Sequence, residues 1–430
     1  MSRSTALLTD HYEFTMLDAA MQAGTAHRRC IFEVFGRRLP KDRAYMVNAG
    51  TGRVLDLIAD FTFGPAELDH LASRRIVSPA TLEWLAEYRF TGDIDGYPEG
   101  ELFFPGSPLM TLTTDFATGV VLETLVLSAL NHDVAVASAA SRMWVQADGR
   151  PLIEMGSRRT HEESAVAAAR AAWIAGFATT SNVEAGRRYG LPTAGTAAHA
   201  FTLLHDTERE AFAAQVAALG VGTTLLVDTY DTHEGIATAL DVAGPQLGAI
   251  RLDSGDLGQL ARDARGILDA AGATSTRIVA TSDLDEYAIA ELADSPVDVY
   301  GVGTSVVTGS GSPAAGLVFK VVEVDGRPVA KASASGKSSI GGRKEASRRI
   351  GPDGVAAAEV IWAAHSAEHS AGEPGASERP LVVALMRSGE RVDTRSLGDA
   401  RDRHAASVRE LPEPGRSLHA EGPAIPTIRV

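Results

Sequence analysis

Three arginines lie in or shortly after apolar runs, where a cationic side chain can bind an anion. Arg158 and Arg159 follow the run 152–155, and Arg251 lies within the run 249–252. A guanidinium can hold a carboxylate or a phosphate through two parallel hydrogen bonds. Each arginine taken alone can equally form a surface salt bridge. Gathered at one edge of a sheet, the three would form a site for an anionic small molecule.

Small and acidic residues follow two of these runs and are suited to phosphate and ribose. The segment Gly301-Val-Gly303-Thr304 ends in small residues, whose backbone N–H groups can approach a phosphate. A tight turn is the alternative. Asp253 follows the run 249–252 and precedes a helical pattern. It can bind ribose hydroxyls or a metal ion, or it can simply cap that helix.

His199 is the histidine with the most suggestive position, because it follows the apolar run 193–195. It is either a catalytic group or a packing residue of an alanine-rich segment. The other histidines include no pair at metal-ligand spacing on a helix. Asp228 and Asp231 can coordinate Mg²⁺ through oxygen, although Asp231 can equally cap a helix.

The composition of the chain narrows the possible classes of protein. A chain of 430 residues with 45% apolar and 22% charged residues is typical of a folded protein of two or three domains, or of a barrel with additions. The net charge of -15 argues against nucleic acid or an anionic membrane as a partner. Cys30 is the single cysteine, which excludes an intrachain disulfide. With no signal-like or membrane-spanning apolar run, we expect a cytoplasmic protein.

A repeated pattern of apolar runs and helices can bring these side chains together. The expected strands lie at 152–155, 176–179, 193–195, 224–227, 249–252, 277–280 and 297–302. The expected helices between them lie at 161–175, 182–189, 207–219, 232–242, 256–271 and 284–293. This alternation predicts parallel strands and an irregular, incomplete α/β barrel. An open doubly wound sheet is the structural alternative.

Helix-end signals support this division. Thr160 with Glu163, and Ser282 with Asp285, have the spacing of capping boxes. Gly190 stands where a glycine commonly ends a helix. In a parallel barrel the active site lies at the carboxyl ends of the strands. The polar segments expected at that rim are 156–159, 180–182, Thr196 with His199, 228–231, 253–256, 281–283 and 303–305.

The remaining segments predict a second domain. Helices are expected at 9–23, 79–89 and 116–140, and strands at 30–36, 317–324 and 380–386. We therefore expect an N-terminal α+β domain over 1–115, completed by strands from about 317–390. The barrel domain is expected over 116–316, and 317–430 is expected to return to the first domain and end in a tail.

Seven segments, taken together and in order over about 7–350, closely resemble nicotinate phosphoribosyltransferases. They are 7–16 (LLTDHYEFTM), 154–159 (EMGSRR), 180–183 (TSNV), 195–201 (GTAAHAF), 251–257 (RLDSGDL), 300–307 (YGVGTSVV), and Lys331 together with 342–344 (GRK). The resemblance implies the irregular barrel typical of type II phosphoribosyltransferases. It implies that nicotinate, 5-phosphoribosyl 1-diphosphate, ATP and water give nicotinate mononucleotide, diphosphate, ADP and phosphate in NAD salvage. It further implies Mg²⁺ held through the diphosphate rather than by protein ligands, and a homodimer with shared active sites.

The resemblance also assigns roles by position. His199 matches the histidine that ATP phosphorylates, and Tyr12 matches an aromatic that stacks on the pyridine ring from the partner subunit. Thr196 and Arg251 match residues of the nicotinate site, where Arg251 is the natural partner of the carboxylate. Asp253 matches an acid near the ribose.

The phosphate groups have their own matches. Gly301, Gly303 and Thr304 match the loop that binds the ribose 5-phosphate, and Arg158 matches a residue near the phosphates. Ser181 stands near the place where enzymes specific for nicotinamide carry an aspartate, so it favours nicotinate. Rival interpretations are a nicotinamide or a quinolinate phosphoribosyltransferase, or a paralogue that binds the ligand without catalysis.

Overall fold

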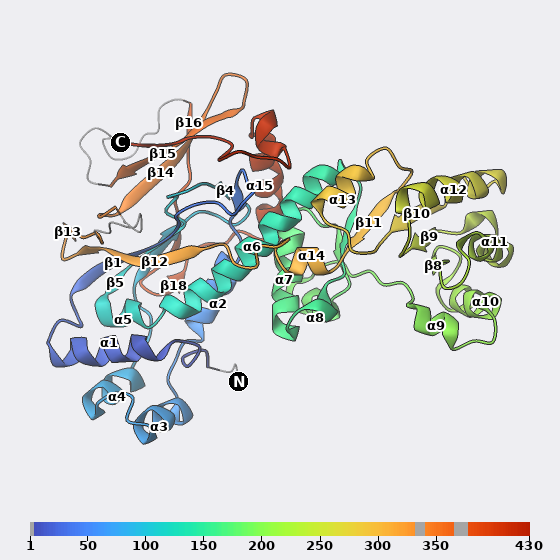
Figure 1. Cartoon of the computed structure of the whole chain (residues 1–430). Coiled ribbons are helices and arrows are strands. Elements are labelled where there is room, and N and C mark those ends of the chain that lie inside the picture. Colours follow the sequence, from blue (N-terminus) through green and yellow to red (C-terminus); the bar gives the residue numbers. More distant parts are fainter. Residues whose placement is uncertain (1–3, 332–339, 365–376) are drawn as a thin grey trace. The chain divides into compact units, whose positions relative to one another are not determined.

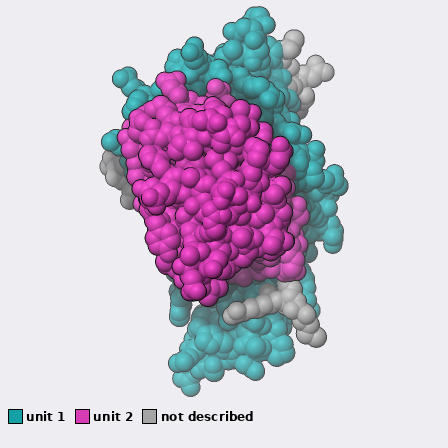
Figure 2. All heavy atoms as spheres, turned by 90° about the vertical axis from the view of Figure 1, so that its right-hand side faces the viewer, with its two compact units in different colours: residues 1–137, 314–430 teal, residues 138–313 magenta. Residues whose placement is uncertain are grey.

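The computed structural model describes residues 4–331, 340–364 and 377–430 (Figure 1). The chain divides into two compact units, shown in different colours in Figure 2. Unit 1 comprises 1–137 and 314–430, and unit 2 comprises 138–313. The expected boundary at 115/116 and the division at 137/138 differ by residues 116–137, which hold a short helix and the first part of a long one, α6 (Glu123–Ala147). Among the described residues, no helix is long and apolar enough to cross a membrane.

Unit 1 is built on mainly antiparallel sheets with helices beside them. Its helices are α1 (His11–Gln22), α2 (Thr51–Ala59), α3 (Pro65–Ser73), α4 (Pro79–Ala86), α5 (Phe116–Val120), the first part of α6, and α15 (Leu397–Arg409). Its main sheet runs β13 (Arg327–Pro328), β12 (Leu317–Val324), β1 (Arg29–Gly36), β5 (Met110–Asp115), β3 (Asp93–Gly96), β17 (Val383–Arg387), β18 (Glu390–Arg391). The smaller sheets are β16 (Glu378–Pro380), β14 (Lys344–Ile350), β15 (Ala356–Ala363), β19 (Thr427–Arg429), and the pair β2 (Met46–Val47), β4 (Leu102–Phe103). Of these strands, β15 and β19 are a parallel pair.

Strands from the two ends of the chain pair within the main sheet of unit 1. The C-terminal strand β12 pairs antiparallel with β1, and β17 pairs with β3. β1 is buried at every position but its first, because helices and the neighbouring sheet cover it. Phe32 of β1 stacks on Phe319 of β12 with 5.1 Å between the ring centroids. Apolar side chains of both segments therefore form one core.

Unit 2 contains six parallel strands and the helices that connect them. The strands are β6 (Leu152–Glu154), β7 (Thr179–Thr180), β8 (Thr224–Leu226), β9 (Ala249–Leu252), β10 (Arg277–Ala280) and β11 (Val299–Val302). The helices are α7 (Glu162–Ile174), α8 (Val183–Tyr189), α9 (His199–Leu203), α10 (Glu208–Leu219), α11 (Thr232–Ala243), α12 (Leu257–Ala270), α13 (Glu286–Glu291) and α14 (Thr304–Val307). Ala249, Val279 and Val299 pack together with Ile153 at the centre of the sheet.

The strand order of unit 2 is that of a barrel broken at one place. The sheet runs β7-β6-β11-β10-β9-β8, and every neighbouring pair is parallel. The first strand, β6, pairs with the last, β11, so the strands follow the sequence around a circle that is open between β7 and β8. This confirms the incomplete α/β barrel, because a doubly wound sheet would not join its first strand to its last.

Most predicted strands and helices of unit 2 are present, and the main exceptions lie near the break. The runs 249–252 and 277–280 coincide with β9 and β10. The run 193–195, however, makes only an isolated bridge from Thr193 to Thr180. Helix α9, which was not predicted, follows it. The helix expected over 116–140 is interrupted after Val120, giving α5 and then α6.

Two of the three predicted helix ends are wrong. Helix α7 begins at Glu162 with His161 as its N-cap, so Thr160 and Glu163 form no capping box. Helix α13 is capped by Asp285 itself, whose carboxylate accepts from two backbone N–H groups of the first turn. The glycine at 190 is confirmed, since Gly190 ends α8 in the left-handed conformation with φ 67°. The linker predicted over 365–378 lies mostly outside the described residues, as does the segment between Lys331 and 342–344.

Candidate active site

A small polar cavity lies at the carboxyl ends of β6, β9, β10 and β11 in unit 2. Its volume is about 210 Å³. The residues that line it are Met155, Arg158, Arg159, Asp253, Thr281, Ser282, Asp283, Gly301, Gly303 and Thr304. Because all six strands are parallel, their carboxyl ends meet at one rim, as the pattern of apolar runs predicts. Arg158, Asp253, Gly301, Gly303 and Thr304, all predicted as site residues, therefore share one cavity.

His199 lies beside Asp253, although the two are far apart in sequence. His199 is the first residue of the short helix α9, in the segment that crosses the break in the barrel. Its Nδ1 is 3.1 Å from the hydroxyl of Thr229, and its Nε2 is 3.8 Å from Oδ2 of Asp253. The His199 side chain is 41% exposed. A histidine held between a hydroxyl and a carboxylate, yet open to solvent, is not a packing residue.

Arg251 belongs to the same group of contacts. It lies in β9, between Val279 of β10 and Leu226 of β8. Its Nη1 donates to Oγ1 of Thr196 at 2.5 Å, and its Nη2 is 3.8 Å from Oδ2 of Asp253. Burial lowers the pKa of Arg251 from its usual value, while Asp253 opposes this effect by attraction. Arg251 is therefore an internal cation of the site rather than a surface ion-pairing residue.

Asp253 does not cap the helix that follows it. That helix, α12, is capped by Asp256, whose carboxylate accepts from the backbone N–H of Gln259. Asp253 instead accepts a hydrogen bond from the hydroxyl of Thr281 and faces His199 and Arg251. The capping alternative is thus wrong, and the carboxylate remains free to face a ligand in the cavity.

Asp228 holds the Asp253 loop from the neighbouring strand end. Its Oδ2 accepts from the backbone N–H of Asp253 at 2.8 Å and from the hydroxyl of Ser254 at 3.1 Å. Asp231 caps α11 by accepting from the backbone N–H of Glu234 at 2.9 Å. Asp228 therefore supports the loop that carries Asp253, whereas Asp231 caps a helix. Within the described part of the chain, no cluster of three or more His, Cys, Asp or Glu could hold a metal ion.

Gly301 and Gly303 are not turn glycines. Gly301 is inside β11, and a Cβ there would lie 2.6 Å from Cγ2 of Thr281 and 2.8 Å from Sδ of Met155. Gly303 has φ -110° and stands directly before α14, which begins at Thr304. The tight-turn alternative is wrong for Gly301, because its missing side chain lets two cavity-lining side chains approach the strand.

Among the other predicted residues, the two arginines line the cavity, whereas Ser181 and Tyr12 do not. Arg158 and Arg159 lie in a short 3₁₀ turn (Ser157–Arg159) and are exposed at the cavity. Ser181 follows β7, and its backbone N–H donates to the carbonyl of Glu154 at 2.8 Å, but it does not line the cavity. Tyr12 lies on α1 in unit 1 and is 46% exposed.

Sequence reasoning placed Thr229 and Thr281 at the rim without giving either a role. Thr229 contacts His199, and Thr281 donates to Asp253. Each is within three residues of the end of its strand, and that position was the available signal. Which polar group each would meet depends on strand neighbours, and these are not visible in the sequence.

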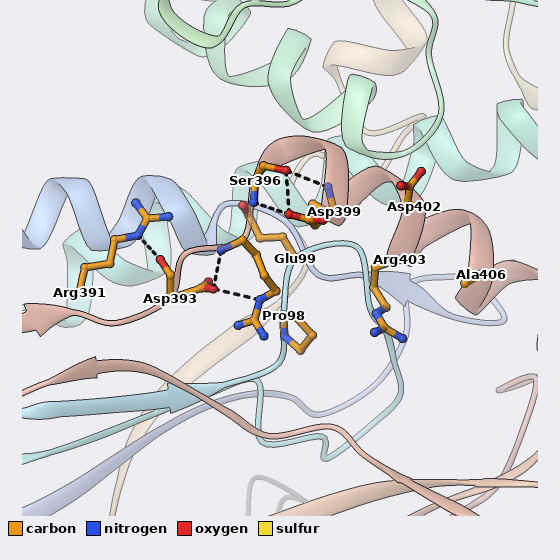
Figure 3. A pocket seen from close by; sticks show the side chains of 11 residues that line it. Pro98, Glu99, Arg391, Asp393, Ser396, Asp399, Asp402, Arg403 and Ala406 are labelled. Atoms are coloured by element: carbon orange, nitrogen blue, oxygen red, sulfur yellow. Dashed lines mark hydrogen bonds and ion pairs between the residues drawn. The ribbon is translucent and has the colours of Figure 1, made fainter.

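A larger hollow of about 390 Å³ lies in unit 1 between the loop after β3, the loop before α15, and α15 itself (Figure 3). Asp393 pairs there with Nε of Arg395 at 3.0 Å. Asp399 accepts from the hydroxyl of Ser396 at 2.7 Å as part of the α15 capping box. These charged groups hold the loop and the helix end together, and no predicted site residue lines the hollow. We therefore place the candidate active site in unit 2.

An incomplete α/β barrel whose carboxyl rim presents arginines, a carboxylate and an exposed histidine defines the class: a phosphoribosyltransferase of the type II fold. Comparison with known proteins narrows this class to one family. Residues 7–131 match the family model of the nicotinate phosphoribosyltransferase (NAPRTase) N-terminal domain.

Similarity extends over the whole chain. It is 56% identical to nicotinate phosphoribosyltransferase PncB1 of Mycobacterium tuberculosis, over 98% of this chain and 94% of that protein. The crystal structure of the human nicotinic acid phosphoribosyltransferase superposes with a TM-score of 0.86 at 27% identity, covering 98% of each chain. A nicotinate-nucleotide pyrophosphorylase from Pyrococcus furiosus shares the fold at 22% identity, with a TM-score of 0.78 and coverage of 95% and 97%. The chain belongs to the nicotinate phosphoribosyltransferase family of enzymes.

Proposed function

We propose that this enzyme joins nicotinate to 5-phosphoribosyl 1-diphosphate with assistance from ATP, giving nicotinate mononucleotide and diphosphate for NAD salvage. The observation that supports this proposal is that Asp253 lies next to both His199 and Arg251, at the rim of a cavity that Arg158 also lines. This arrangement places a nucleophilic ring, a carboxylate and two anion-binding arginines at one rim.

Arg251 is the proposed partner of the nicotinate carboxylate. It is 12% exposed, and Thr196 fixes one of its Nη atoms. A partly buried guanidinium binds a carboxylate more strongly than an exposed one does, and the neutral amide of nicotinamide would leave the cation uncompensated. Ser181, near the position where nicotinamide enzymes carry an aspartate, supports the same preference. A competition assay between the two substrates separates these alternatives.

In the proposed transfer, the ring nitrogen of nicotinate forms a bond to C1 of the ribose as the bond from C1 to the diphosphate oxygen breaks. Positive charge develops on the ribose ring, and the Asp253 carboxylate stabilises it. Thr281 holds this carboxylate by a hydrogen bond, and Asp228 fixes its backbone. Arg158 and Arg159 counter the charge of the departing diphosphate, and the segment from Gly303 to Thr304 receives the 5-phosphate.

His199 is the proposed acceptor of the γ-phosphoryl group of ATP. Its two polar neighbours, Thr229 and Asp253, orient the ring. The exposure of the side chain leaves the ring accessible to ATP. A phosphorylated His199 would place negative charge next to the cavity that binds the anionic donor. ATP hydrolysis can then switch the site between tight binding and release, which is a coupling of two binding free energies.

The proposed reaction also uses Mg²⁺, and the residues present fit an ion held largely by the substrate. Two carboxylates, Asp253 and Asp283, line the cavity. Oxygen ligands suit Mg²⁺, which commonly binds one or two carboxylates together with phosphate oxygens and water. The ion would neutralise the leaving diphosphate, with Asp253 and Asp283 as its protein neighbours.

We further propose a homodimer with shared active sites, in which Tyr12 stacks on the pyridine ring bound by the partner. The exposure of Tyr12 on α1 supports this role, since a packed tyrosine could not reach a second chain. The mass of the protein in solution tests it, and a monomer with full activity would exclude it. A cytoplasmic location without nucleic-acid or membrane partners remains our prediction from composition.

The first experiment measures nicotinate mononucleotide formation from nicotinate, 5-phosphoribosyl 1-diphosphate and Mg²⁺, with and without ATP. We expect ATP to accelerate the wild-type protein and to leave His199→Ala unchanged at the basal rate. His205→Ala is the matched control, because the His205 ring hydrogen-bonds to the carbonyl of Phe201 one helical turn away and does not line the cavity. It should respond to ATP as the wild type does.

The outcomes separate the parts of the proposal. Product formation that ATP does not alter in either protein would retain the transferase and remove the phosphohistidine. An ATP response that survives in His199→Ala would assign phosphorylation to another group. No product from nicotinate under any condition would leave a binding protein or an enzyme with another substrate.

A further inference from the structure

Glu154 is a buried carboxylate beneath the rim, and the chemistry described above does not use it. It ends β6 and is only 1% exposed. One oxygen, Oε1, accepts from the backbone N–H of Gly156. The other, Oε2, accepts from the hydroxyl of Thr180 at 2.5 Å. Its side chain therefore connects the segment after β6 with the end of β7.

The connection continues into the second loop. The Thr180 hydroxyl, which donates to Glu154, accepts in turn from the backbone N–H of Asn182 at 2.9 Å. The side-chain amide of Asn182 donates back to the hydroxyl of Ser157 at 3.0 Å. These contacts form a closed path through the turn that carries Arg158 and the loop that carries Ser181.

The same turn is held from a third side. A Cβ on Gly156 would lie 2.2 Å from Cγ1 of Val307 and 2.9 Å from the carbonyl oxygen of Gly303. The turn after β6 therefore packs directly on α14 and the residue before it. Fixing Gly156 fixes the position of Arg158 relative to Gly303 and Thr304.

Both carboxylate oxygens of Glu154 act as hydrogen-bond acceptors. Glu154 forms no salt bridge with any residue that the structure describes, and burial raises the pKa of its carboxyl above the usual value. Burying a carboxyl group without a cation is unfavourable, so stability alone does not explain it. Its two oxygens accept from the Gly156 N–H and the Thr180 hydroxyl. An amide in its place would offer only one acceptor, so the hydrogen bond with the Thr180 hydroxyl would have to reverse its direction.

We propose that Glu154 is a positioning residue that sets the spacing between Arg158 and the Gly303–Thr304 segment, and so determines affinity for the phosphoribosyl donor. This inference rests on the proposed function, which assigns the diphosphate and the 5-phosphate to those groups. Glu154 does not line the cavity and acts through the two loops that it joins.

The test compares Glu154→Gln and Thr180→Val with the matched control Thr179→Val. Thr179 precedes Thr180 in β7, so its side chain points to the opposite face of the strand. We expect KM for 5-phosphoribosyl 1-diphosphate to rise about tenfold in Glu154→Gln and Thr180→Val, because a displaced binding group loses this much or more. The KM for nicotinate and the melting temperature should change little, and Thr179→Val should match the wild type.

A direct binding measurement keeps this inference separate from the proposed function. Titration calorimetry with 5-phosphoribosyl 1-diphosphate and Mg²⁺ should show the same tenfold weakening, whether or not nicotinate is the second substrate. Unchanged donor affinity in both variants would overturn the positioning role. A parallel loss of both substrate affinities and of thermal stability would show that Glu154 only supports the fold. If Glu154→Gln does not fold, Thr180→Val, which exchanges one hydroxyl for a methyl group, decides the question.

Discussion

At the scale of single residues, the site is a set of side chains that position one another. Asp253 accepts from Thr281, faces His199 and Arg251, and is held through its backbone by Asp228. A group that stabilises charge in a transition state must already have its final position, because reorganisation would consume the gain. The supporting residues should therefore affect turnover almost as strongly as the groups that touch substrate.

Asp228 and Asp231 allow this expectation to be tested with a matched pair. Asp228→Ala removes the acceptor for the Asp253 backbone, so we expect kcat/KM to fall by about 10- to 100-fold through misplacement of that carboxylate. Asp231→Ala removes the α11 cap and should lower the free energy of unfolding by about 1 kcal/mol, with kcat/KM nearly unchanged. Steady-state kinetics and urea denaturation measure the two effects. Equal kinetic losses in both variants would contradict the positioning role of Asp228.

At the scale of elements, the barrel strands act as supports whose spacing is set by close packing. β11 lies between β6 and β10, and it approaches the side chains of both neighbours at Gly301. A missing side chain is thus as important for the cavity as the polar groups that line it. The site also depends on the break in the barrel, because α9, which begins at His199, lies in the segment between β7 and β8.

Gly301→Ala should distort the cavity. The added methyl group would lie within 2.8 Å of Met155 and Thr281, so we expect a loss of about 1–3 kcal/mol in unfolding free energy and weaker binding of the phosphoribosyl donor. Gly266→Ala is the control, since Gly266 is inside α12 and no neighbouring atom lies within 4 Å of the place that a methyl group would take. That change should stabilise the protein by about 0.5–1 kcal/mol. Thermal unfolding and donor binding distinguish the two, and a stabilised Gly301→Ala would refute the packing argument.

At the scale of the whole molecule, segments remote in sequence complete unit 1. Arg348 of β14 is fully buried and donates to Glu359 at 3.0 Å and to the carbonyl of Leu102 at 2.8 Å. Burial raises the pKa of the Glu359 carboxyl, although Arg348 opposes that shift. The C-terminal strands and the N-terminal segment are therefore joined by charged as well as apolar contacts, and truncation of the C-terminal segment should prevent unit 1 from folding.

His404 gives the folded protein a defined response to acid. It lies in α15, is fully buried, and burial lowers its pKa to about 3. Above its ordinary pKa near 6.5, the ring is neutral in both the folded and the unfolded state and contributes no pH dependence. Between about 6.5 and 3 the unfolded state binds a proton that the folded state excludes, so stability falls as pH falls.

We therefore expect His404→Gln to have a shallower pH dependence of unfolding than the wild type. The difference in slope should reach about 1.4 kcal/mol per pH unit between about pH 6 and pH 4. Denaturant unfolding at a series of pH values measures it, and the comparison of slopes is independent of any constant loss caused by the substitution. Parallel curves for the two proteins would show that the imidazole is protonated in the folded state.

Local patterns in the sequence were sufficient to predict most strands and helices of unit 2, the family and most of the residues that line the cavity. An apolar run of about four residues and the polar residue after it are read directly from the chain. Asp253 and Arg251 could therefore be placed at the carboxyl end of a strand before any neighbour was known.

Which of these groups meet was settled only by tertiary packing. Strand order places β6 beside β11, so Arg158 and Thr304 share a cavity although more than a hundred residues separate them in the chain. The structure also showed that Asp253 is not the cap of α12, because Asp256 occupies the capping position. The role of Glu154 as a buried hydrogen-bond acceptor could not be predicted from the sequence for the same reason. Its partners come from another loop, and only the packing of parallel strands brings that loop within hydrogen-bonding distance.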